Sequence, residues 1–156
     1  MAYHTIKIKK YSDVIEELIS TAVTLTPGML LEVITGGYVR KHATSEGDVT
    51  PPMFALEDEL QGRGIDDDYA VSSKIQVWIP GRGDRVNAFL KNGESVVAGD
   101  MLASGGDGTL IKHVMEVDPQ SVSVNPNQIV AIAMEAVDMS GSSGVDPGGR
   151  IDVMII

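Results

Sequence analysis

Short apolar runs follow one another along the chain, and turns rich in Gly, Pro, Asn and Asp separate them. Polar and apolar side chains alternate in residues 74–77 (KIQV) and 150–153 (RIDV), and two further apolar residues follow each run. A period of two residues is typical of a strand with one buried face, and short strands at close spacing favour a sandwich or barrel. The pattern predicts an all-β fold, a compact β-barrel or sandwich of short antiparallel strands and hairpins.

Two segments also fit a short helix, so the prediction allows for one or two helices. Residues 13–20 (DVIEELIS) place their aliphatic side chains on one helical stripe, with Ser12 as an N-cap. Val and Ile suit an extended chain equally well, which leaves residues 12–20 open between helix and strand. Residues 56–61 are the second, weaker candidate.

One β unit occurs twice in the sequence. Residues 27–42 (PGMLLEVITGGYVRKH) align without a gap on residues 98–113 (AGDMLASGGDGTLIKH), each 71 positions before its counterpart. Both copies read as a strand, a Gly-rich turn and a returning strand, because Gly supplies the positive φ that hairpin turns need. The matched pairs are Gly28 with Gly99, Leu31 with Leu102, Gly37 with Gly108, Lys41 with Lys112, and His42 with His113.

Further matching blocks follow in the same order in both copies: 54–57 with 132–135, 64–66 with 144–146, and 74–79 with 150–155. Collinear matches indicate an internal duplication, and we expect the two units to be related by an approximate two-fold axis. The predicted organisation is an N-terminal arm (1–23), a first β unit (24–80), a connector with one strand (81–94) and a second β unit (95–156), all in one compact body.

Composition and charge narrow the functional classes. Of the 156 residues, 43% are hydrophobic and 22% are charged, as in ordinary folded proteins, and the absence of Cys excludes thiol chemistry. The formal net charge of −10 argues against a nucleic-acid partner, because clustered Lys and Arg bind phosphates. No apolar stretch approaches the length of a membrane helix, so we expect a soluble protein without a membrane partner.

Positive charge gathers in one N-terminal run, which consists of Thr5, Ile6, Lys7, Ile8, Lys9 and Lys10. Its apolar and basic side chains alternate as in a strand, so the run can pair with a foreign sheet edge while its isoleucines fill pockets. These six residues are the predicted partner-binding site. Two other interpretations stay open: a solvated edge strand, and an integral strand of the barrel.

The string GGDGT at residues 105–109 is also found in nucleotide-binding loops of lipid kinases and NAD kinases, where Gly lets backbone N–H groups approach phosphate. Such a loop needs a following helix whose N-terminus faces the phosphate. Here the next residues, LIKH, continue as a strand, and the repeat aligns the string with TGGY, which carries no such signature. We predict a hairpin turn without a ligand.

No pattern of residues indicates catalysis or a metal centre. The acidic runs at 57–59 and 66–68 lack the spacing of a calcium loop, and we predict that they are solvated surface. His42 and His113 end equivalent hairpins, and no Ser lies in a nucleophile-elbow motif. We expect no catalytic residue, no metal and no cofactor, and hence a protein that is not an enzyme.

Two other features have structural interpretations. Arg82, Gly83 and Asp84 spell the cell-adhesion tripeptide, but a tight turn between two strands explains them without a receptor. Trp78 alternates with aliphatic neighbours in a strand and is predicted to lie in the core.

Residues 54–67 (FALEDELQGRGIDD) and 76–84 (QVWIPGRGD), with shorter strings at 98–102, 106–110 and 132–138, carry a family resemblance. Together they resemble the capsid decoration, or head cement, proteins of tailed bacteriophages. The resemblance extends over most of the chain, from about residue 6 to residue 156. It provides no residue-level motif for contacts, so none is carried over.

The resemblance implies a virion protein that binds the outer surface of the assembled capsid between capsomers and stabilises the head. Its partners would be the phage major capsid protein and other copies of itself, commonly as a homotrimer, alternatively as a dimer. It would be synthesised in the bacterial host cytoplasm.

Two other functions stay open. One is a different virion structural component, such as a tail or host-binding β module that uses residues 82–84. The other, weaker, is a nucleotide-binding domain that uses the GGDGT string.

Overall fold

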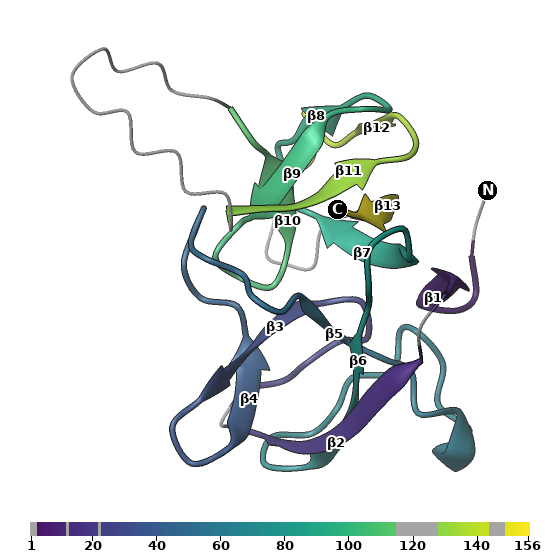
Figure 1. Ribbon diagram of the computed structural model, residues 1–156, viewed down its shortest axis with the longest axis vertical. Coiled ribbons are helices and arrows are strands. Elements are labelled where there is room, and N and C mark those ends of the chain that lie inside the picture. Colours follow the sequence, from purple (N-terminus) through teal and green to yellow (C-terminus); the bar gives the residue numbers. More distant parts are fainter. Residues whose placement is uncertain (1–2, 12, 22, 115–127, 144–148) are drawn as a thin grey trace.

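The computed structural model describes residues 3–11, 13–21, 23–114, 128–143 and 149–156. These residues form an all-β molecule, as predicted, with one short 3₁₀ helix, η1 (Glu59–Gln61), inside the second helical candidate. No helix in these ranges has the length and hydropathy to cross a membrane. Figure 1 shows two β bodies, the purple and blue one below and the teal to yellow one above.

The lower body is a closed five-stranded barrel with the strand order β2-β4-β3-β5-β6. Residues 13–20, which the pattern leaves between helix and strand, contain strand β2, while Ser12 lies outside the described residues. Leu25, Leu31 and Ile75 fill its interior. The strands are β2 (Val14–Ser20), β3 (Leu30–Ile34), β4 (Tyr38–Lys41), β5 (Met53–Ala55) and β6 (Lys74–Ile79).

The upper body is a second ring of five strands, because β7 and β13 pair and so close the sheet order β7-β10-β9-β11-β13. Its strands are β7 (Arg85–Leu90), β9 (Met101–Ser104), β10 (Leu110–Lys112), β11 (Ile129–Ala133) and β13 (Gly149–Ile155). Strand β1 (Lys7–Lys9) adds to β7 from outside the ring, and β8 (Ser95–Val96) pairs with β12 (Val137–Asp138) in a separate ladder.

The two rings are one structure built twice. Strands β2 to β6 correspond in order to β7, β9, β10, β11 and β13, and each set pairs in the same cyclic order. The registers agree residue by residue: Leu31 pairs with Lys41 as Leu102 pairs with Lys112, and Ala55 with Val77 as Ala133 with Val153. The predicted duplication is confirmed in these blocks. The block at 144–146 lies outside the described residues.

The boundaries of the units differ from the predicted ones. Strand β2, which the sequence analysis placed in the N-terminal arm, belongs to the first barrel, and β7, which it placed in the connector, belongs to the second. Equivalent bridges show the relation, since Ser20 pairs with Val39 as Leu90 pairs with Leu110. β2 and β7 share no identical residue in this alignment, which hid the match at the sequence level.

The barrels meet head to tail, so the predicted two-fold relation is wrong. In the turn at 105–109, Gly108 donates its N–H to the His42 carbonyl (3.1 Å) and accepts from the Leu30 N–H (2.8 Å). The equivalent turn of the first barrel, at 35–37, is exposed. A two-fold axis would make every contact reciprocal, and this contact is not.

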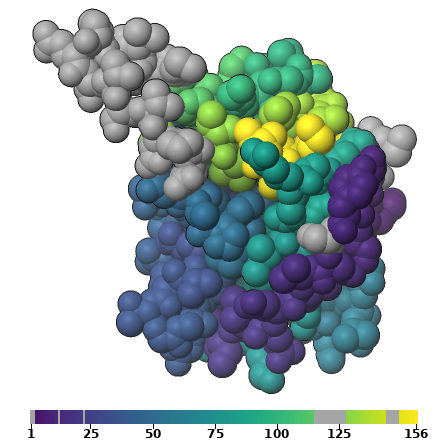
Figure 2. All heavy atoms as spheres, viewed as in Figure 1, coloured from purple at the N-terminus to yellow at the C-terminus, as the bar shows by residue number. Residues whose placement is uncertain are grey.

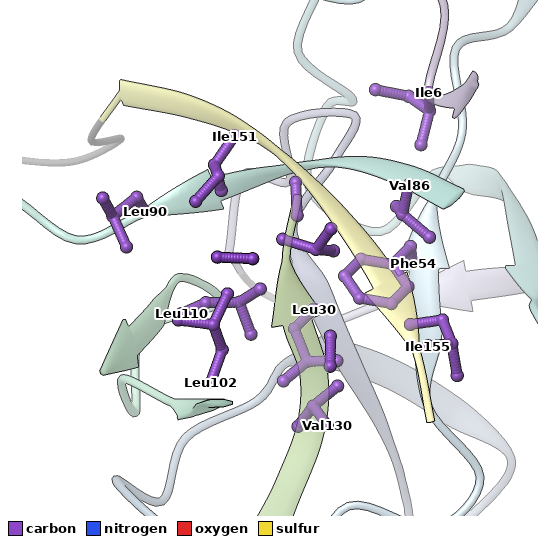
Figure 3. Packing of buried hydrophobic residues seen from close by; sticks show 14 of the residues in the cluster. Ile6, Leu30, Phe54, Val86, Leu90, Leu102, Leu110, Val130, Ile151 and Ile155 are labelled. Atoms are coloured by element: carbon purple, nitrogen blue, oxygen red, sulfur yellow. The ribbon is translucent and has the colours of Figure 1, made fainter. Parts of the chain in front are cut away.

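An apolar row on the outer face of the first barrel fills the contact between the two barrels, here called the joint. Leu30, Phe54 and Trp78 are neighbours across β3, β5 and β6, and each is 0% exposed. They belong to one cluster with Leu102 and Leu110 from inside the second barrel, part of which Figure 3 shows. The barrels therefore share a hydrophobic core, and Trp78 lies in it as predicted.

The joint predicts different costs for two equivalent Gly→Ala substitutions. Gly37 and Gly108 both have positive φ (77° and 83°), but a Cβ at 37 meets nothing within 4 Å, whereas one at 108 lies 3.0 Å from the Cβ of Lys41. Gly37→Ala should lower the free energy of unfolding by about 1–2 kcal/mol through backbone strain. Gly108→Ala should cost about 1–3 kcal/mol more, because it also overpacks the joint. Denaturant titration measures the free energy of unfolding of both variants. Equal losses would contradict the close packing of Gly108 against the first barrel.

Candidate interaction surface

The predicted partner-binding run forms an edge strand on its own molecule. Strand β1 pairs antiparallel with β7, with Lys7 opposite Val86 and Lys9 opposite Arg85. The Asn87 N–H donates to the Ile6 carbonyl at 2.9 Å. Figure 1 shows β1 beside the end of β7. Of the interpretations that the sequence left open, the structure shows an edge strand, which is added to β7 outside the closed ring of the second barrel. Partner binding by the run stays a prediction.

The first half of the run points into the molecule. Ile6 is 0% exposed and belongs to the shared core. Its N–H donates to both carboxylate oxygens of Glu57 (3.1 and 3.2 Å), and the Thr5 hydroxyl donates to the same carboxylate. Glu57 is buried, so its prediction as solvated surface is wrong. A buried carboxylate needs such donors in place of water.

The second half of the run points outward. Lys9 and Lys10 are exposed, while Lys7 and Ile8 are half-buried. Lys10 and Lys7 donate to Asp13 (2.5 and 3.0 Å), and these hydrogen bonds hold the pKa of the Asp13 carboxyl below its usual range. The exposed side chains of the run are therefore those of Lys9, whose Nζ lies 5.0 Å from the Tyr11 ring centroid, and Lys10, which is bonded to Asp13.

The GGDGT string forms the predicted hairpin turn, and several of its polar groups have partners within the molecule. Asp107 accepts from the Thr109 N–H (3.2 Å) and hydroxyl, and its other oxygen lies 3.2 Å from Lys91 Nζ. Burial raises the pKa of Asp107, but the hydrogen bonds from Thr109 and Lys91 outweigh it, so the net shift is downward. The Gly106 N–H donates to Ser104 Oγ at 3.1 Å. The turn docks one barrel on the other.

Sequence reasoning missed a polar contact across the joint. Ser104 Oγ lies 2.7 Å from His42 Nδ1. His42 Nε2 lies 3.2 Å from the Asp48 carbonyl oxygen and 3.8 Å from the carboxylate of Glu32. In a nucleophilic triad, a Ser contacts a His, which in turn contacts an acidic residue, and these three residues follow that order of contact. However, Ser104 is 0% and His42 3% exposed, so no substrate can reach the hydroxyl. The two residues are 62 positions apart in different repeat units, and no local motif could have linked them.

The remaining candidates also have structural roles. Asp84 of the adhesion tripeptide is 0% exposed, and its carboxylate accepts from the N–H groups of Gly81 (2.8 Å) and Tyr11. Only Arg82 of the tripeptide is exposed. The acidic run at 66–68 is exposed, as predicted. In the described part of the chain, no group of three His, Asp or Glu side chains could hold a metal ion.

A solved structure with a similar fold is the N base of the head fibre gp8.5 of bacteriophage phi29. The match has a TM-score of 0.55 and covers 93% of this chain and 95% of that chain, at 16% sequence identity. No protein-family model matches the sequence, and no curated protein matches it. At this identity the likeness shows a shared fold, over almost the whole of both chains.

The position of Ile6 predicts that β1 supports the body of the protein. Ile6→Ala should lower the free energy of unfolding by about 2–4 kcal/mol, because it leaves a cavity in the core. Ile8→Ala, at a half-buried position two residues further along, is the matched control and should cost about 1 kcal/mol or less. Deletion of residues 1–10 should destabilise further, since Glu57 then keeps a buried charge without donors. An unchanged melting temperature after the deletion would show that β1 is dispensable.

Proposed function

We propose that this protein is a phage capsid decoration protein that binds the outer surface of the assembled head, between capsomers, and stabilises it. Its partner is the major capsid protein. The observation that carries the proposal is the fold, which is similar to that of a phage head fibre base over 93% of this chain. The family resemblance of residues 54–67 and 76–84 supports the same role independently.

Charge supports a role on the outside of a head. With a net charge of −10, the protein would not compete for binding to the packaged genome. Its exposed basic groups include Lys9 and Lys10 on the outer side of β1, where they can meet acidic groups of a coat subunit.

We also propose that the protein has no enzymatic activity and binds no cofactor. The groups that suggested chemistry have structural roles: the GGDGT turn docks the barrels, and the His42–Ser104 pair lies buried in the same joint.

Stabilisation follows from mass action. A ligand that binds only the assembled shell lowers its free energy by RT ln(1 + [L]/Kd), about 2.7 kcal/mol per site at a hundredfold excess over Kd. Because a shell presents many equivalent sites, a modest gain per site opposes the loss of any one capsomer.

Binding to undecorated shells, assembled from the phage's own coat protein, tests the proposal. We expect saturable binding to shells, none to unassembled subunits, and density between capsomers in particle images. Lys9→Glu with Lys10→Glu should lower occupancy, because it places carboxylates against an acidic partner. The control, Arg63→Glu with Arg82→Glu, makes the same charge change elsewhere and should bind normally. Absence from shells combined with binding to tail components would replace the proposal by the tail alternative.

Self-association has a candidate surface on the second barrel. Met101, Ile132 and Met154 are neighbours across β9, β11 and β13 and correspond to Leu30, Phe54 and Trp78 of the first barrel. In the first barrel this row is buried, whereas Met101 is 46% exposed. A head-to-tail contact between copies that closes on itself forms a ring, and we propose a homotrimer.

The mass of the purified protein in solution tests the trimer. We expect three times the 16.6 kDa of the chain, measured by light scattering. Met101→Lys should dissociate the assembly, because it buries a charge in an apolar contact. Val71→Lys, at a position that is 52% exposed on another surface, should not. A twofold mass would replace the trimer by a dimer, and a monomer at all concentrations would reject self-association.

A further inference from the structure

Strand β2 has a free edge along part of its length. On one side it pairs with β6 over the whole stretch from Val14 to Ile19, but on the other side β4 reaches only Ile19 and Ser20. No other described strand pairs with β2. Val14 and Ile15 are 49% and 41% exposed. The purple atoms of this segment lie uncovered across the front of the molecule in Figure 2.

The polar groups of this edge have a defined direction. In an antiparallel ladder, residues alternate between those that exchange hydrogen bonds with the partner strand and those that point away from it. The Ser20 N–H donates to Ser73 on the β6 side, so Leu18 and Glu16 also bond to β6. Ile15 and Glu17 therefore direct their N–H and C=O groups away from β6, toward the free edge.

The second barrel shows what such an edge binds. In the repeat, Ile15 to Glu17 correspond to Arg85 to Asn87 of β7, and there the edge is occupied by β1. The Asn87 N–H, the equivalent of the Glu17 N–H, donates to the Ile6 carbonyl at 2.9 Å. One barrel thus has an additional strand at the position where the other barrel has none.

A groove beside the free edge has the chemistry for such a strand. Its volume is about 420 Å³, against roughly 150 Å³ for a cavity that holds benzene. No Lys or Arg lines it in the described part of the chain, and Arg40 contacts Glu32 from outside at 2.7 Å. The lining includes the apolar residues Val33, Met53 and Ile79 and the acidic residues Glu16, Glu32 and Asp48.

We propose that the edge of β2 at Ile15 and Glu17 binds an extended, basic segment of the partner protein. The segment adds antiparallel to β2, with apolar side chains in the groove and basic ones against its carboxylates, as β1 adds to β7. The inference deepens the proposed function and rests on it only for the identity of the partner. The binding itself is a property of the isolated protein.

The occupant is not the N-terminal run of a second copy. In each molecule Ile6 is fully buried in the molecule's own core and Glu57 holds the run in place. Moving β1 to a neighbour would open a cavity and leave a buried carboxylate without donors, at a cost that one added strand does not offset.

Amide hydrogen exchange with a model strand tests the proposal. The probe is a synthetic peptide of residues 3–11 (YHTIKIKKY), added to the full-length protein at low salt. We expect saturable binding below about 1 mM and new protection at the amides of Ile15 and Glu17. The Glu16 amide, already bonded to β6, should not change. A peptide with Glu in place of each Lys should not bind.

Two variants test the charge contribution. Glu16→Gln should weaken peptide binding about two- to fivefold, the effect of one partly exposed charge pair, and high salt should remove the difference. Glu59→Gln, exposed in η1, is the control and should have no effect.

Three outcomes would overturn the proposal. The first is no binding, and the second is loss of protection at the Asn87 amide, which would mean that the peptide only replaced β1. The third is protection of Ile15 and Glu17 that rises with protein concentration alone, which would assign the edge to a second copy. Peptide binding without shell binding would reject the proposed function and support this inference. Shell binding without peptide binding would support the proposed function and reject this inference.

Discussion

The buried row of Leu30, Phe54 and Trp78 determines the shape of the whole molecule. Fully burying a large apolar side chain contributes about 1.5–3 kcal/mol, so the row contributes roughly 5–9 kcal/mol. A whole domain is stable by only about 5–15 kcal/mol. The outer face of the first barrel therefore forms part of the hydrophobic core of the second barrel. The two barrels fold as one body. The close approach at Gly108 lies beside this row, because Gly108 accepts a hydrogen bond from the Leu30 N–H.

The sequence predicted the parts of the fold that depend on local rules. The hairpins at 27–42 and 98–113 were identifiable because positive-φ glycines and inward-facing leucines must recur wherever the same turn is built. The match between β2 and β7 was not identifiable. In this alignment Glu16 and Glu17, which are exposed, correspond to Val86 and Asn87, which are buried. The burial of each position determines which type of side chain it holds. Burial in turn depends on contacts between residues that are far apart in the sequence.

The strand conformation of the candidate partner-binding run was predicted, but its place in the fold was not. Alternation of Ile and Lys at residues 5–10 correctly indicated a strand, since a period of two is a local property. Which edge the strand pairs with depends on the fold, and here it is β7 of the same molecule. In this position Ile6 is buried in the core, whereas Lys9 and Lys10 are exposed to solvent. The Ser104–His42 contact shows the same limit, because it joins repeat units that only the head-to-tail joint brings together.

Head-to-tail duplication explains why so much of this surface is left unpaired. A reciprocal joint would have buried both copies of each contact, whereas a heterologous joint uses one copy and exposes the other. The 105–109 turn is docked and the 35–37 turn is exposed. The Leu30 row is covered, while Met101 of the equivalent row is 46% exposed. The edge of β7 is capped by β1, whereas among the described strands none pairs with the edge of β2 at Ile15 and Glu17. Each of these exposed surfaces has an equivalent in the other repeat unit that makes a contact within the same chain. The proposed homotrimer and the proposed partner strand would each repeat a contact that the fold already makes.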